Sequence, residues 1–148
     1  MLTIRPATAE DQAAVLDLVE ELFTPPGSRP LNYRRERAVY AFRHATEAFD
    51  ADVLVAVDDD GRIVGLASVY VDLETIRFGR RCWLEDLVVT ASARNRGVGR
   101  RLLDAATEWA RGHRCTHLGL VSAAARGDAH RFYVANGMDP MLHFTRPV

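Results

Sequence analysis

The first third of the chain combines one short alternating segment with two stretches of helical periodicity. Residues 2–5 alternate between apolar and polar side chains, which predicts a strand. Thr8 and Asp11 form a variant of the capping box, and the apolar positions after them predict a helix over about residues 9–23. Asn32 can cap a second helix. The apolar face of that helix would be formed by Val39, Phe42, Ala45 and Phe49.

The middle of the chain is typical of β-strands. Residues 53–57 and 63–71 are apolar runs rich in valine, and the Asp60-Gly61 pair between them is a strong hairpin signal. Residues 83–90 predict a further strand. This part of the chain is therefore expected to form a strand, a hairpin turn and two more strands.

The last third returns to an alternation of helices and strands. Apolar positions at helical spacing predict a helix closed by Gly112, and residues 118–121 predict a buried strand. Asp128 caps a short helix that ends near residue 136, and residues 141–145 predict a terminal strand. The fold class is therefore α/β, with helices able to cover both faces of a sheet.

Length and composition indicate one ordinary globular domain. A chain of 148 residues has the size of a single domain. A net charge of -1 argues against a nucleic-acid binder that depends on bulk charge. All 19 basic side chains are arginine, which excludes P-loop, protein-kinase and Schiff-base chemistry because each needs a lysine. No apolar run approaches the ~20 residues of a membrane span, so we expect a cytoplasmic protein without a membrane partner.

The segment from Leu84 to Leu103 carries the most specific chemistry. A strand runs into a turn that contains Gly97 and Gly99, and the turn leads directly into an amphipathic helix. Such a turn presents free backbone N–H groups and the positive end of a helix dipole, so we expect it to bind phosphate. The dinucleotide fingerprint would need a third glycine where Leu102 stands, which excludes a Rossmann-type site.

The pattern Arg94-x-x-Gly97-x-Gly99 resembles the pyrophosphate-binding signature of the GNAT superfamily, the acetyl-CoA-dependent N-acetyltransferases. Residues 128–138 resemble the late helix of this superfamily, and residues 4–11 resemble its first strand and helix start. The resemblance implies one GNAT domain over residues 1–148, with a mixed, mostly antiparallel sheet. The implied order is β-α-α-β-β-β-α-β-α-β, with a splay between the fourth and fifth strands. Two departures are Arg126, where many members carry asparagine, and Met138, where phenylalanine is common.

The resemblance implies acetyl-CoA as the co-substrate, with its pantetheine along the fourth strand and its diphosphate on the glycine turn. The residues implied in binding it are Leu87, Val88, Val89, Arg94, Asn95, Arg96, Gly97, Val98, Gly99 and Arg100. No metal is expected. His113, Cys115 and His117 would share one face of an extended segment, but we interpret them as a helix-to-strand connection.

The implied reaction is direct attack of a free amine on the thioester, which needs a proton acceptor and a proton donor. Glu85 is the candidate base, and Leu-Glu-Asp at this place resembles spermidine/spermine-type members. Asp86 would point to the opposite face of a regular strand, although a β-bulge would reverse that parity. Tyr133 is the candidate donor to the leaving thiolate.

Arginines around the second helix, including Arg34 and Arg35, either pair with the acidic first helix or bind an amine that carries an anionic group. His130 lies one turn before Tyr133 and could contact the acceptor, although such a histidine is more often structural. The segment around His130 also resembles the aminoalkylphosphonate N-acetyltransferases, whereas the acidic first helix could equally favour a polyamine.

Two function classes follow. The first is an N-acetyltransferase for a small-molecule amine, with a homodimer implied by the resemblance. The alternative is a catalytically idle GNAT-like module that binds CoA or a partner protein. A nucleic-acid patch formed by Arg94, Arg96, Arg100 and Arg101 is disfavoured by the acidic balance of the rest of the chain.

Overall fold

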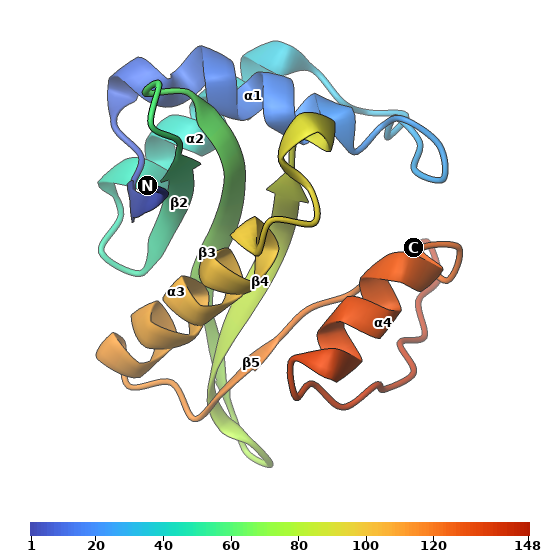
Figure 1. Cartoon of the computed structure of the whole chain (residues 1–148). Coiled ribbons are helices and arrows are strands. Elements are labelled where there is room, and N and C mark those ends of the chain that lie inside the picture. The colour runs from blue at the N-terminus through green and yellow to red at the C-terminus, as the bar shows by residue number, and fades with distance from the viewer.

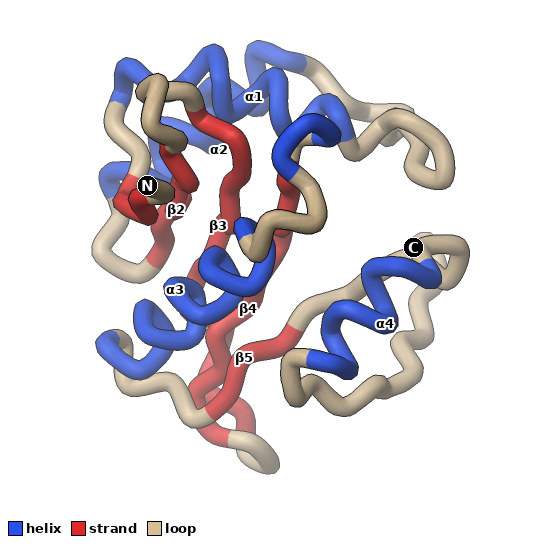
Figure 2. Tube along the Cα trace, viewed as in Figure 1, coloured by secondary structure: helices blue, strands red, loops and turns tan.

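The computed structural model describes all residues from 1 to 148. It contains one five-stranded sheet in the order β1-β2-β3-β4-β5 (Figures 1 and 2). The strands are β1 (Thr3–Pro6), β2 (Ala51–Val57), β3 (Ile63–Thr75), β4 (Gly79–Val89) and β5 (His117–Gly119). The first four strands pair antiparallel, and β5 pairs parallel to β4. The predicted mixed, mostly antiparallel sheet is therefore confirmed.

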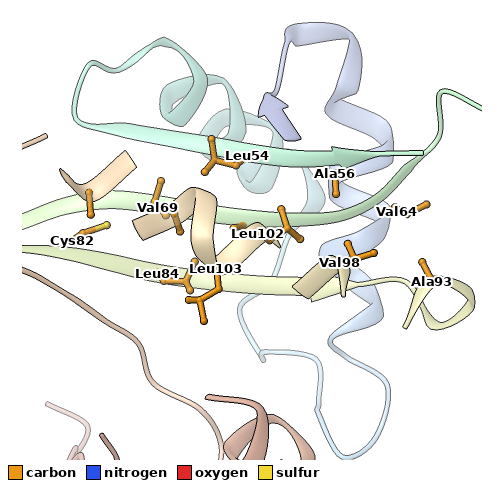
Figure 3. Close-up of a cluster of buried hydrophobic side chains, with 13 residues drawn as sticks. Leu54, Ala56, Val64, Val69, Cys82, Leu84, Ala93, Val98, Leu102 and Leu103 are labelled. Carbon is orange, nitrogen blue, oxygen red and sulfur yellow. The ribbon is translucent and has the colours of Figure 1, made fainter. Parts of the chain in front are cut away.

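Helices cover both faces of this sheet. The helices are α1 (Gln12–Glu21), α2 (Arg35–Glu47), α3 (Val98–Gly112) and α4 (Gly127–Ala135), with short 3-10 turns at Ala9–Asp11 and Ala91–Ala93. On one face, α1 and α2 pack on a cluster that includes Val53, Val55 and Val88. On the other face, α3 packs on Leu54 and Ala56 among others (Figure 3). Because residues 53–57 of β2 are covered on both faces, this part of the strand is a continuous apolar run.

The sheet opens between β4 and β5. The two strands pair over only three positions, the last of which joins Trp83 to Gly119. Beyond this point the chain turns away from the sheet toward α4, which stands apart from the other helices (Figure 1). The edge of β4 over residues 84–89 therefore has no strand partner on this side, as the predicted splay requires.

The predicted terminal strand is wrong. Residues 141–145 form no strand, and Met141, Leu142 and Phe144 are largely exposed. The order of elements therefore ends with α4 rather than with a further strand. A strand needs a neighbouring backbone edge as well as a suitable local pattern. This segment hydrogen-bonds to no such edge, and β5 itself is only three residues long.

Other boundaries shift by a few residues. The second helix begins at Arg35 because Tyr33 N–H closes a turn on the Pro30 carbonyl, and Arg34 is extended with a φ of -139°. This helix ends at Glu47, so Phe49, expected on its apolar face, lies beyond its end and is 86% exposed. No helix is both long and apolar enough to cross a membrane.

Candidate active site

The turn between β4 and α3 presents unpaired backbone N–H groups. The amides of residues 95–100 donate to no acceptor within the chain. Asn95 and Gly97 adopt left-handed φ values of 60° and 77°, which bend the turn. The guanidinium of Arg94 donates from Nε to the Val89 carbonyl at 3.1 Å, so it ties the turn to the end of β4. This geometry is typical of an anion site at a helix N-terminus.

Gly97 in the turn and Gly99 in the first turn of α3 occupy different environments. Gly97 is required by its left-handed backbone, while the space around it is open. At Gly99 an added Cβ would lie 3.4 Å from the ring of Phe132. This distance is an ordinary van der Waals contact, so Gly99 marks the place where Phe132 of α4 packs against the start of α3.

A β-bulge lies in β4 next to the open edge. Ser68 pairs with Asp86 and Val69 pairs with Leu84, so Glu85 has no partner on β3. In a regular strand Leu84 and Asp86 would share a face. Here Leu84 packs in the cluster on the α3 side, whereas Asp86 shares the face of its cross-strand partner Ser68. The bulge thus turns Asp86 toward α1 and α2, the reversal of parity considered above.

A cavity of about 450 Å³ lies between this face of the sheet and helices α1 and α2. Most of its walls are hydrophobic, and no arginine lines it. Its polar and charged lining residues are His44, Asp50, Asp52, Ser68, Tyr70, Glu85 and Asp86. The cavity therefore combines apolar walls with acidic groups.

Asp52 differs from the other three acids of the cavity. It pairs with Val69, which packs on the α3 side of the sheet. Burial raises the pKa of Asp52, and Trp109 and His113 of the α3 region oppose that shift. Its carboxylate therefore faces α3, which leaves Asp50, Glu85 and Asp86 as the acids of the cavity.

The pKa of Asp86 lies well above the usual range of an aspartate. Burial, together with the negative charge of Glu85, raises the pKa of Asp86 to about 6. The Ser68 hydroxyl donates to Asp86 Oδ2 at 3.3 Å and opposes this rise. Glu85 is exposed and accepts a hydrogen bond from Trp83 Nε1 at 2.8 Å. Both carboxylates remain available to a ligand in the cavity.

The main chain of β4 beyond the bulge has the form expected for a pantetheine site. The outer edge at Leu87, Val88 and Val89 has no strand partner. The side chain of Val88 is buried on the α1 and α2 side, and Leu87 and Val89 pack on the α3 side. Packing therefore fixes this edge, whose polar backbone groups can accept an extended ligand.

Tyr133 belongs to α4. This helix stands across the open edge from β4 (Figure 1). Its hydroxyl makes no hydrogen bond within the chain. Burial raises the pKa of Tyr133, and the positive charge of Arg126 acts in the opposite direction. His130, one turn earlier, has its Nε2 2.9 Å from the Ala123 carbonyl oxygen, so its ring is engaged at the start of the same helix.

The arginines of the second helix do not reach the cavity. Arg35 pairs with Asp17 at 3.0 Å and with Glu20, both on α1. Arg34 donates to the Tyr33 carbonyl oxygen at 2.8 Å. The structure therefore shows Arg35 in ion pairs between the two oppositely charged helices, which is the first of the two alternatives considered above.

Several residues of the cavity were not predicted from the sequence. Asp50, Ser68 and Tyr70 come from the start of β2 and from β3, and only the pairing of these strands brings them together. The polar Ser68 within an apolar run was the one local sign. No group of three or more histidine, cysteine or acidic side chains is arranged to hold a metal ion.

The chain is similar to known proteins in sequence and in fold. Residues 14–138 match the family described as "Acetyltransferase (GNAT) family". The chain is 46% identical over 59 residues to the N-acetyltransferase YhdJ of Bacillus subtilis (strain 168), a region that covers 40% of this chain and 42% of that protein. It is 35% identical over 115 residues to the aminoglycoside N(6')-acetyltransferase type 1 of Klebsiella aerogenes, covering 76% and 73% of the two chains.

The chain is also similar to a plant enzyme and to a solved structure. The chain is 38% identical over 117 residues to glucosamine 6-phosphate N-acetyltransferase 1 of Oryza sativa subsp. japonica, covering 76% and 67% of the two chains. Among solved structures, that of the aminoglycoside N-acetyltransferase AAC(6')-Iy in complex with CoA superposes with a TM-score of 0.84. This superposition covers 99% of this chain and 95% of the other at 18% identity, which is evidence of a common fold.

Proposed function

The chain belongs to the GNAT family of acetyl-CoA-dependent acetyltransferases, and on this basis we propose that it acetylates an aliphatic amine with a second positive charge, such as a diamine or a polyamine. The observation that carries the proposal is the cavity beside the open edge of β4. Its walls are mostly apolar, its acids are Asp50, Glu85 and Asp86, and no arginine lines it. Such a cavity favours ammonium groups on a hydrocarbon chain and disfavours phosphonates.

The unpaired amides of residues 95–100 would hold the diphosphate of acetyl-CoA, and Arg96 and Arg100 add positive charge at the same turn. The open edge of β4 at Leu87, Val88 and Val89 would bind pantetheine through its main chain. In this arrangement the thioester lies near the bulge. The bulge in turn brings the two carboxylates to the mouth of the acceptor cavity.

Asp86 would accept the proton of the amine. A primary amine with a pKa of about 10.4 is neutral in roughly one molecule in a few thousand at pH 7, which is a deficit of about 4–5 kcal/mol. Glu85 and Asp86 stabilise the incoming ammonium group, and Asp86, with a pKa of about 6, is ionised at neutral pH and can take the proton directly or through water. Here Asp86 replaces Glu85 as the first candidate for the base, because the bulge turns it into the cavity.

Tyr133 would complete the reaction. The amine nitrogen attacks the thioester carbonyl, the C–N bond forms, the C–S bond breaks, and the electron pair remains on sulfur. The attacking nitrogen loses its second proton to water, directly or through Asp86 after Asp86 has released the first proton to solvent. Tyr133 donates its phenolic proton to this thiolate and then recovers a proton from solvent. Its hydroxyl makes no hydrogen bond within the chain, and burial keeps it protonated because it raises the pKa.

A thiol-release screen with acetyl-CoA tests this proposal against polyamines, aminoalkylphosphonates, aminoglycosides, amino acids and peptide N-termini. We expect release with diamines and polyamines, with the N-acetyl product identified by mass. Calorimetric titration with CoA distinguishes the alternative, since an idle CoA-binding module would give heat of binding but no release with any amine. A cytoplasmic location and a homodimer stay predictions.

A further inference from the structure

Helix α4 and the segments around it are joined to the rest of the protein by one hydrogen bond. Residues 120–148 otherwise make hydrogen bonds and ion pairs only among themselves. The exception is Arg126, which donates from Nη2 to the Leu22 carbonyl oxygen at 3.0 Å. Apolar packing supplies a second attachment, in which Phe132 and Met138 contact the cluster beneath α3. The position of α4 therefore depends on one polar contact at its start and on apolar contacts further along.

The Arg126–Leu22 contact is built into the loop that follows α1. An added Cβ at Gly27 would lie 1.9 Å from the Leu22 carbonyl oxygen and 2.4 Å from Arg126 Nη2. Gly27 does not have a left-handed φ, so the glycine is explained by this close approach rather than by backbone conformation. The loop is thus folded closely around the guanidinium.

The contact connects two parts of the proposed site. Leu22 directly follows α1, whose Val15 and Val19 line the acceptor cavity. Arg126 is the N-cap residue of α4 and stands seven residues before Tyr133, so the two lie on the same face about two turns apart. Arg126 is also the one charged group of the chain that shifts the pKa of Tyr133, and it lowers it.

We propose that Arg126 is a positioning residue for acetyl transfer, which holds α4 against the end of α1 and so fixes Tyr133 at the open edge of β4. The inference rests on the proposed function for the role of Tyr133, but the contact itself does not depend on it. A second consequence is electrostatic. The guanidinium stabilises the tyrosinate that forms when Tyr133 gives up its proton, which asparagine at this position would not do.

The variants that test this are Arg126→Gln, which removes the charge, and Arg126→Lys, which keeps it. Arg131→Gln is the matched control, because Arg131 lies on the same helix, is exposed and pairs only with Asp128. The first readout is amide hydrogen exchange of α4 and of Gly27 without any substrate. We expect about tenfold faster exchange at both places in Arg126→Gln, and little change in Arg126→Lys or in the control. Unchanged exchange in Arg126→Gln, or an equal change in the control, would overturn the positioning role.

The second readout uses the best amine found by thiol release. In Arg126→Gln we expect kcat to fall about tenfold with the KM of the amine nearly unchanged, and the basic limb of the kcat profile to move to higher pH. Adding Arg126→Gln to Tyr133→Phe should cost little more, because Arg126 acts through Tyr133. Full additivity in this double-mutant cycle, or an unmoved basic limb, would refute the electrostatic part. If Tyr133→Phe alone leaves kcat intact, the proposed role of Tyr133 is wrong. The hydrogen-exchange result still shows whether the contact between Arg126 and Leu22 holds α4 in place.

Discussion

The bulge at Glu85 leads to a prediction in which two substitutions shift the pH dependence of the reaction in opposite directions. Burial, together with the negative charge of Glu85, raises the pKa of Asp86 to about 6, whereas the Ser68 hydroxyl acts to lower it. If Asp86 is the base, the acid limb of kcat/KM lies near pH 6, because Asp86 must be ionised to accept a proton. Glu85→Gln removes the neighbouring negative charge and should move this limb to lower pH. Ser68→Ala removes the hydrogen bond and should move it to higher pH.

The largest loss of activity is expected when Asp86 itself is replaced. Asp86→Asn should abolish this limb and lower kcat/KM by about 10²–10³, the usual contribution of a positioned general base. Asp104→Asn on α3 is the control, because this aspartate is exposed and makes no ion pair. The assay is thiol release between about pH 5 and pH 8 with a single amine. The ionisation of that amine affects all variants equally, so differences between their pH profiles come from the protein. Shifts of equal sign in Glu85→Gln and Ser68→Ala, or a large loss in Glu85→Gln beside full activity in Asp86→Asn, would refute the reasoning.

Two further predictions concern the diphosphate turn and the stability of the fold. Gly97→Ala forces a side chain into a left-handed backbone and should weaken CoA binding at least tenfold in calorimetry, whereas Gly112→Ala, which meets open space, should not. Asp11→Asn breaks the ion pair with Arg5 at 2.7 Å, whose guanidinium holds the pKa of Asp11 below its usual range. It should lower the free energy of unfolding by about 1–2 kcal/mol at pH 7 in urea titrations. Because the folded pKa is depressed, this stabilisation is present above about pH 4 and is lost as the pH falls through the folded pKa, so equal differences at pH 7 and pH 2 would contradict it.

Much of the fold could be predicted from local patterns. The apolar runs at residues 53–57 and 63–71 required two buried faces, and the structure supplies α3 on one side and α1 with α2 on the other. The turn at residues 95–100 was predicted from two glycines before an amphipathic helix, and its amides are unpaired as expected. These features depend on a few consecutive residues, so the sequence contains nearly all the information that determines them.

The rest depends on pairing between distant segments. The bulge at Glu85 is visible only in the register between β3 and β4, and one unpaired residue there exchanges the faces of every residue after it. Residues 141–145 were expected to form a strand, but this segment has no neighbouring strand edge in the fold. Arg126 was identified as a departure from a family pattern, and its contact with Leu22 spans 104 positions of the chain. Local periodicity in the sequence could therefore not predict that contact.

The most direct measurement compares two acceptors with the same hydrocarbon chain, an alkyl diamine and the corresponding aminoalkylphosphonate, in thiol release with acetyl-CoA. The cavity offers Asp50, Glu85 and Asp86 and no arginine, so we predict a kcat/KM at least about a hundredfold higher for the diamine. Equal rates, or a preference for the phosphonate, would contradict the assignment of this acidic cavity as the acceptor site.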